Sequence, residues 1–286
     1  MTALVLTFNS PELLTHCLAA VSSQTVPPRR VLVVDNASAH PVDDLVDRVP
    51  GGQVLRLADN LGPAGGHAAG LRAFLESDSE WAWIMDDDCV PRPDALARQL
   101  ALALERPGRR VVMATMVERD AGHVTNTEGW CCVLLPRAVV EAVGVPRADF
   151  FWWVEDTEYL QWRIPRAGFE VVRSETATVA VGRDREDESK PAWKYYYEVR
   201  NLVYYRMWIQ RPSGPGDRKQ QAFHRRFGKA CRSTGRFVAR VVVRERSRRA
   251  DKLVHIARGV YDGATGRLGR TITPSTADRP LAPTGK

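Results

Sequence analysis

The feature that most constrains the fold is an apolar run that ends directly in three carboxylates. Residues 81–85 (Trp-Ala-Trp-Ile-Met) precede Asp86, Asp87 and Asp88, and a proline-containing turn follows at residues 90–93. Such a run is typical of a buried strand that ends at the open edge of a parallel sheet. Three adjacent negative charges repel one another unless a cation lies among them. We therefore interpret the stretch as a strand that carries a metal site to the sheet edge.

The alternation of side chains along a strand indicates which acids share the ion. Asp86 and Asp88 lie on one face of an extended chain, while Asp87 points elsewhere. Carboxylate ligands favour Mg²⁺ or Mn²⁺ over zinc, and substrate phosphates commonly complete such a site. A solvated acidic turn after a strand is the alternative interpretation, and it stays open at this point.

Length and composition favour a globular α/β protein without disulfides. The 286 residues are 44% apolar and 26% charged, which suffices for a full core and an appended segment. The five cysteines have no CxxC or zinc spacing and fit a reducing compartment. The first residues lack the pattern of a secretory signal, and no stretch approaches the roughly 20 apolar residues that span a bilayer. We expect a cytoplasmic protein.

The first 70 residues predict a parallel sheet. Residues 3–8 and 30–34 are apolar strands, and the helix between them begins at Ser10, a candidate N-cap followed by proline, and ends at about Ser23. Ligands bind beyond the carboxyl ends of such strands, where Asp35 follows the second one. After a third strand at residues 54–57, a glycine-rich turn at residues 59–70 allows close approach to a phosphate or sugar, although it lacks the GxGxxG spacing.

A second acidic cluster follows a run of four aromatic residues. Residues 150–153 (Phe-Phe-Trp-Trp) precede Glu155 and Asp156, which lie where a helix is expected to begin and where its dipole stabilises carboxylates. Asp156 is a candidate general base beside an aromatic wall, and core packing is the alternative role for the rings. Residues 183–190 are expected to form a charged loop. Residues 194–205 predict either an interfacial helix in which Arg200 reaches a phosphate or a helix that packs its tyrosines on the core.

The net charge of +7 resides in the C-terminal part of the chain. Residues 211–270 contain 17 Lys/Arg and 4 Asp/Glu, a local charge of +13. Residues 220–269 alternate basic and apolar side chains, which predicts a helical segment that lies on an anionic membrane surface, peripheral to the inner face of the plasma membrane. Nucleic acid is not expected as a partner, because the segment has no recognised nucleic-acid-binding motif.

Four stretches, taken in order, resemble a family 2 glycosyltransferase of the GT-A fold. They are residues 4–9, 33–38 and 60–66 and the run Asp86–Asp88. The resemblance covers roughly residues 1–205 and is specific as a set. Residues 152–156 and 195–201 are similar to the bacterial rhamnosyltransferase and galactofuranosyltransferase branch, which includes actinobacterial enzymes that act on lipid-linked cell-wall intermediates.

The resemblance implies a fold class and a division of the chain. The expected class is α/β: a Rossmann-like, mostly parallel sheet flanked by helices, with a helical C-terminal segment. A glycosyltransferase domain would occupy residues 1–205, a basic amphipathic helical segment residues 206–270, and a flexible tail residues 271–286.

The resemblance also implies an inverting transfer of a rhamnose- or galactofuranose-like sugar from a UDP- or dTDP-sugar. The acceptor would be a hydroxyl of a lipid-linked glycan or a small molecule. Asp86 and Asp88 would bind Mg²⁺ or Mn²⁺, and Asp156 would deprotonate the acceptor. Weaker contacts with acceptor or phosphate are implied for Trp152, Trp153, Glu155 and Arg200. Asp86 is also implied to contact the nucleotide sugar. The other implied contacts with the nucleotide sugar are Thr7, Asp35, Asn60, Gly65, Gly66 and Asp87.

The chain departs from the family in one respect. Related enzymes commonly have a histidine metal ligand some 20–25 residues beyond the base, whereas residues 170–190 contain none. Asp184, another acid of the loop or water could replace it. An inactive relative that binds a nucleotide sugar or carbohydrate is therefore a second hypothesis, and a nucleotidyltransferase that uses the same acidic site is a third.

Overall fold

The computed structural model describes residues 1–118, 124–125, 129–181, 190–210, 219–245 and 247–273. The chain divides into two compact units. The first unit comprises residues 1–148 and 155–185, and it contains the sheet. The second unit comprises residues 149–154 and 186–286, and it contains the long helices of the C-terminal part.

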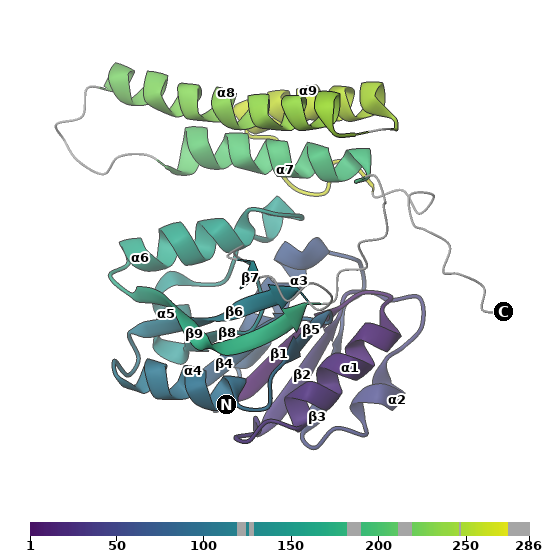
Figure 1. The fold of residues 1–286 in the computed structure, drawn as a ribbon, viewed down its shortest axis with the longest axis vertical. Coiled ribbons are helices and arrows are strands. Elements are labelled where there is room, and N and C mark those ends of the chain that lie inside the picture. The colour runs from purple at the N-terminus through teal and green to yellow at the C-terminus, as the bar shows by residue number, and fades with distance from the viewer. Residues whose placement is uncertain (119–123, 126–128, 182–189, 211–218, 246, 274–286) are drawn as a thin grey trace. The chain divides into compact units, whose positions relative to one another are not determined.

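The first unit is built on a mixed sheet whose strand order is β3-β2-β1-β4-β8-β6-β9-β5, with β7 paired to β6 (Figure 1). Strands β3, β2, β1 and β4 run parallel to one another, while β8 runs antiparallel to β4 and β6. The predicted α/β class is confirmed, and antiparallel strands extend the predicted parallel part. The strands are β1 (Thr2–Thr7), β2 (Arg30–Asp35), β3 (Gly52–Arg56), β4 (Trp81–Asp86), β5 (Cys89–Pro91), β6 (Arg110–Glu118), β7 (Val124–Thr125), β8 (Val133–Pro136) and β9 (Glu170–Val181).

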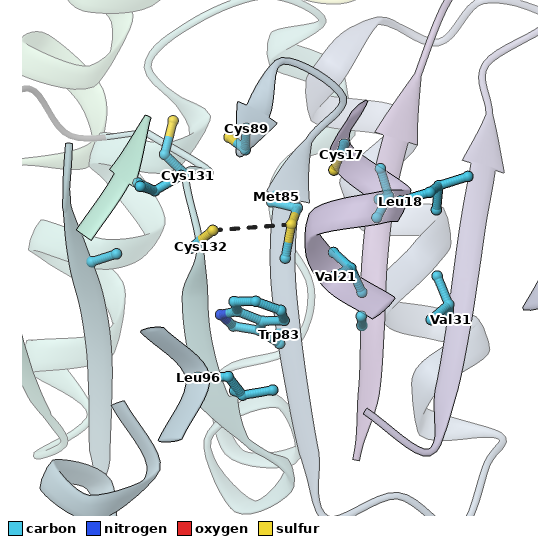
Figure 2. Packing of buried hydrophobic residues seen from close by; sticks show 14 of the residues in the cluster. Cys17, Leu18, Val21, Val31, Trp83, Met85, Cys89, Leu96, Cys131 and Cys132 are labelled. Carbon is cyan, nitrogen blue, oxygen red and sulfur yellow. Dashed lines mark hydrogen bonds between the residues drawn. The ribbon is translucent and has the colours of Figure 1, made fainter. Parts of the chain in front are cut away.

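Helices cover both faces of the sheet because its strands are apolar on both sides. Trp83 and Met85 of β4 belong to a core with Cys17 and Leu96 on one face, shown in Figure 2. Ile84, between them in sequence, packs on the other face with residues of α3 and α5. The helices of this unit are α1 (Pro11–Ser22), α2 (Asp43–Val46), α3 (Gly62–Leu75), α4 (Ala95–Leu104), α5 (Arg137–Val143), the π-helical η2 (Thr157–Arg163) and α6 (Ile164–Arg166).

The strand register brings the polar strand ends together. Thr7 pairs with Asp35 across β1 and β2, and Leu6 pairs with Asp86 across β1 and β4. The three parallel strands therefore end within one residue of each other at the same edge. This edge is where the sequence predicted a ligand site.

Two local expectations need adjustment. Helix α1 begins at Pro11 as predicted, but the Ser10 hydroxyl donates to the Phe8 carbonyl oxygen at 3.2 Å and makes no cap bond. The basic region was expected as one helical segment, whereas the structure has two helices separated by a short break.

The second unit is a small helical assembly. Helix α9 lies close to α7 because Gly259 and Gly263 have no side chains. A Cβ at Gly259 would lie 2.7 Å from the Tyr196 carbonyl oxygen, and one at Gly263 would lie 2.4 Å from the Arg200 carbonyl oxygen. Within the described residues, no helix is long and apolar enough to cross a membrane. The elements are α7 (Ala192–Tyr204), the π-helical η3 (Tyr205–Ile209), α8 (Lys219–Val243) and α9 (Arg249–Thr265).

Candidate active site

The first two carboxylates of the acidic run, at the end of β4, are held by different elements. Asp86 Oδ1 lies 3.0 Å from His67 Nε2 of α3, and Asp87 Oδ2 accepts a hydrogen bond from Thr7 Oγ1 of β1 at 2.6 Å. Asp88 is half-buried, and the Cys89 thiol donates to its Oδ1 at 3.7 Å. Asp87 thus turns toward β1, while Asp86 is engaged by α3.

The acidic run carries a substantial electrostatic cost. Burial, together with the charges of Asp86 and Asp88, raises the pKa of Asp87 to about 7, although the hydrogen bond from Thr7 opposes the shift. Desolvation and like charges both disfavour ionisation of a carboxyl group.

His67 is a residue of this edge that sequence reasoning missed. Its side chain is buried at 3% exposure, and its ring lies 5.0 Å from the Trp130 ring, which in turn lies 5.8 Å from the Tyr159 ring. The Trp130 carbonyl oxygen accepts a hydrogen bond from the Asp86 backbone N–H at 3.1 Å. Trp130 and His67 therefore fix the backbone and the side chain of the same aspartate.

Asp156 borders the same loop. A Cβ at Gly129, next to Trp130, would lie 3.9 Å from Asp156 Oδ2. The other oxygen, Oδ1, accepts from the Thr157 backbone N–H at 2.6 Å and caps the π-helical turn that follows. Such turns recur at functional sites. Asp86, which precedes residues 129–130 in the chain, and Asp156, which follows them, thus both adjoin this short segment.

Glu155 is buried beside Asp156. It is 3% exposed, and its Oε2 atom has no hydrogen-bond partner among the described residues. Burial first, and the Asp156 charge second, raise the pKa of Glu155 well above its ordinary value of 4.5. At a pH near 4.5, where a free glutamate is half ionised, the raised pKa therefore keeps the Glu155 carboxyl largely neutral.

Asp35 is fully buried and already paired. Its Oδ2 accepts from Arg56 Nη1 at 2.6 Å, and its Oδ1 accepts from the Ser38 backbone N–H at 2.9 Å. Arg56 is 41% exposed. Any nucleoside at this position meets a carboxylate that Arg56 orients, and sequence reasoning had not identified Arg56.

The glycine-rich turn is organised by packing and by two asparagines. Asn60 Oδ1 accepts from the Gly62 backbone N–H at 2.8 Å and from Asn36 Nδ2 at 3.2 Å, which ties the turn to the end of β2. A Cβ at Gly66 would lie 2.3 Å from Leu6 Cδ1, and one at Gly65 would lie 2.4 Å from Leu61 Cβ. Both glycines are buried: the missing side chain at Gly66 lets α3 pack on Leu6 of β1, and that at Gly65 leaves room for the Leu61 side chain at the start of α3.

Three other predicted contact residues lie in the second unit. Arg200 is fully buried and donates to the carbonyl oxygens of Gly269 at 2.6 Å and Phe150 at 2.8 Å, which gives its guanidinium a structural role there. Trp153 is 41% exposed, and the Lys190 ammonium lies 5.1 Å from its ring centroid. The Trp152 ring packs at 4.9 Å on Trp193.

The metal-ligating side chains at the sheet edge suit a hard divalent cation only if a substrate supplies further ligands. No group of three or more His, Cys, Asp or Glu side chains is arranged to hold a metal within the described part of the chain. Two carboxylates, from Asp86 and Asp88, are a common protein share of a Mg²⁺ site that substrate phosphates and water complete. Asp184 lies outside the described residues.

Comparisons with known proteins identify the first half of the chain. Residues 2–142 match the family model described as glycosyl transferase family 2. Galactofuranosyltransferase GlfT1 of Mycolicibacterium smegmatis is 40% identical over 90 residues, which cover 31% of this chain and 30% of that protein. The match thus spans about a third of the relative's length.

Solved structures resemble the fold across both units. S. aureus TarS 1–349 in complex with UDP-GlcNAc has a TM-score of 0.58 and 15% identity, with 93% of this chain and 91% of that chain covered. Mannosyltransferase PcManGT from Pyrobaculum calidifontis, in complex with GDP-Man and Mn²⁺, has a TM-score of 0.57 and 15% identity, with 93% and 87% covered. Through residues 2–142 the chain belongs to glycosyl transferase family 2, and its structure has the GT-A fold.

Proposed function

We propose that the protein is an inverting glycosyltransferase that moves a sugar from a UDP- or dTDP-sugar to an acceptor hydroxyl. The observation that carries the proposal is that Asp86 adjoins Trp130 while Asp156 adjoins Gly129, the residue before it. One acidic group suited to a cation and another suited to a base thus adjoin the same segment. The named galactofuranosyltransferase relative supports a galactofuranose-like sugar, and a rhamnose-like sugar is the alternative that the sequence resemblance leaves.

Asp86 and Asp88 are the residues that would hold Mg²⁺ or Mn²⁺. When bound, such an ion neutralises the charge that develops on the departing diphosphate. His67 Nε2 lies 3.0 Å from Asp86 Oδ1 and limits the rotation of this carboxylate, which would keep it in one orientation for the ion. The Mn²⁺ found with a structural neighbour supports this cofactor.

We assign the donor's nucleoside to Thr7, Asp35 and Asn60, with Arg56 orienting Asp35. The sugar diphosphate would lie toward Gly65, Gly66 and Asp87. The exposed guanidinium of Arg56 offers a cation beside the strand ends, in the region where the donor must enter. UDP-GlcNAc and GDP-Man bound to the two structural neighbours support a nucleotide sugar as the partner.

Asp156 is the general base in this proposal. Its Oδ1 is held by the Thr157 N–H, so Oδ2 is the atom assigned to accept the acceptor's hydroxyl proton. The acceptor oxygen then forms a bond to the anomeric carbon as the bond to the diphosphate oxygen breaks, and the electron pair leaves with the nucleoside diphosphate. One displacement inverts the anomeric carbon and needs no covalent enzyme intermediate.

The acceptor is assigned as a lipid-linked glycan or a small molecule, with Glu155, Trp152 and Trp153 as its weaker contacts. The basic residues 220–269 support work at the inner face of the plasma membrane, where anionic lipids attract positive charge.

Product analysis tests the proposal. The protein is incubated with UDP- and dTDP-sugars, Mg²⁺ or Mn²⁺ and candidate acceptors, and the released nucleotide is identified. A nucleoside diphosphate together with an inverted glycoside is the expected result. Pyrophosphate would instead identify a nucleotidyltransferase. Donor binding without hydrolysis or transfer under any metal would identify an inactive nucleotide-sugar or carbohydrate-binding relative.

A further inference from the structure

The second unit contains an open groove with a volume of about 720 Å³ whose walls are almost entirely apolar. Helix α8 supplies most of the lining, between Phe227 and Val243. Val203 and Met207 line it from α7 and η3, and Val260 and Ala264 line it from α9. All these residues belong to the second unit, so the groove is defined within one compact body.

The groove has a packing origin. Gly259 and Gly263 bring α9 so close to α7 that these two helices pack backbone to backbone. Helix α8 joins this core through Ala230 and Val241, which are buried. Next to them on α8, a stripe of small residues leaves space: Cys231, Thr234, Gly235 and Ala239. A Cβ at Gly235 in that stripe would meet nothing within 4 Å.

The apolar surface of the groove is exposed to an unusual degree. Phe227 is 49% exposed, Val242 is 51% exposed and Val243 is 75% exposed, and all three line the groove. Clustered exposure of large apolar side chains on one helix face marks an interaction surface. Filling this groove with hydrocarbon is favourable, because it removes apolar surface from water.

The charge on α8 identifies the kind of occupant. The helix carries seven Lys/Arg and no Asp/Glu. Arg232 and Arg236 directly follow groove residues Cys231 and Gly235, so each lies about 100° further round the helix, and both are exposed. An apolar slot flanked by positive charge matches a molecule with a hydrocarbon chain and an anionic head.

Other occupants fit less well. A second copy of the chain would bring two such basic helices together, and like charges across an interface are unfavourable. The neighbouring sequence segments at residues 211–218 and 274–286 contain only one large aliphatic residue, Leu281. They therefore offer little apolar surface with which to fill the groove.

We propose that this groove binds a hydrocarbon chain of an anionic membrane lipid, with the α8 arginines around the lipid phosphate. The inference goes beyond the proposed transfer reaction. It also differs from simple adsorption of a basic helix, because the chain enters the protein. Its test measures lipid binding without any sugar donor, so its failure and the failure of the transfer proposal are separate results.

Cys231 provides the readout. It lines the groove and is exposed, whereas Cys17, Cys89, Cys131 and Cys132 are buried. The full chain is treated with a water-soluble maleimide in the presence of phosphatidylglycerol vesicles, of phosphatidylcholine vesicles, or of neither. We expect the alkylation rate of Cys231 to fall about tenfold with phosphatidylglycerol, as mass action requires when nine-tenths of the protein is bound, and to change little with phosphatidylcholine.

A matched pair of variants separates chain entry from surface adsorption. Ala239 and Ala257 are both exposed on long helices, but only Ala239 lines the groove. Ala239→Phe fills the groove and should abolish the protection of Cys231, while Ala257→Phe should leave it intact. In addition, phosphatidylglycerol with brominated chains should quench a bimane attached to Cys231.

Three results would overturn the proposal. The first is equal protection in both phenylalanine variants, or stronger protection in Ala239→Phe, since added apolar surface favours adsorption. The second is the absence of any protection by phosphatidylglycerol. The third is protection without lipid that increases with protein concentration, together with a doubled mass in light scattering, which would assign the groove to a second copy.

Discussion

His67 offers a sharp test of how the acidic edge is organised. The change is His67→Ala, which removes the 3.0 Å contact to Asp86 Oδ1 and the ring that lies 5.0 Å from Trp130. Asp86 then gains rotational freedom, and the carboxylate no longer starts from a fixed orientation when it meets a cation. Loss of an outer partner of a metal ligand typically weakens metal affinity by about 10–100-fold, so we expect an effect in this range.

The assay is a titration of Mn²⁺ followed by electron paramagnetic resonance, with UDP or dTDP present at a fixed saturating concentration. His67→Gln keeps a side-chain donor and should lie between wild type and His67→Ala. His40→Ala removes an exposed histidine and should match wild type. Circular dichroism confirms that each variant is folded at the titration temperature. Unchanged Mn²⁺ affinity in a folded His67→Ala would refute the reasoning.

The remaining predictions concern packing and ionisation. Gly263→Ala should lower the free energy of unfolding by about 1–3 kcal/mol, since the new Cβ meets the Arg200 carbonyl oxygen. Gly235→Ala adds a Cβ in open space and should raise the free energy of unfolding by about 0.5–1 kcal/mol. Equal shifts of the two variants in urea titrations would contradict this. Asn201 Nδ2 donates to three carbonyl oxygens of residues 150–153, so Asn201→Ala should cost about 1–3 kcal/mol and Asn201→Asp more, because a buried carboxylate would face those oxygens. The reverse order in thermal unfolding would exclude the donor role. The raised pKa of Glu155 means that the folded state binds a proton which the unfolded state has lost, so wild-type stability from this group falls as the pH rises above 4.5. Glu155→Gln should therefore gain stability over wild type as the pH rises, and a pH-independent difference would count against it.

The parallel part of the sheet could be predicted because its strands are written as uninterrupted apolar runs. Buried strands of this kind end in polar residues, so Asp35 and Asp86 were placed at one edge before their register was known. Strand β9 was missed, because Glu170–Val181 mixes charged, hydroxyl and apolar residues and owes its strand to pairing with β6. Contacts made with a distant neighbour leave no local period in the sequence.

The same limit applies to individual side chains of the site. A lone His67 in a glycine-rich helix carries no local signal that it reaches Asp86, which is 19 residues away in the chain. The aromatic pattern around Arg200 fitted both a surface helix and a core helix, and only the carbonyl oxygens around its guanidinium show that it is buried. Sequence patterns placed charges on elements, but tertiary packing decided which charges face a ligand.

The proposed role of Asp156 is the central claim, and Asp156→Asn tests it most directly. The nucleotide affinity and the transfer rate of the variant are measured side by side, with Asp94→Asn, an exposed aspartate paired with Arg98, as the matched control. The account predicts that transfer falls by about 10²–10⁴-fold while nucleotide affinity stays close to wild type, because a general base acts on the acceptor and not on the donor. Wild-type turnover in Asp156→Asn, with the nucleotide still bound, would contradict it.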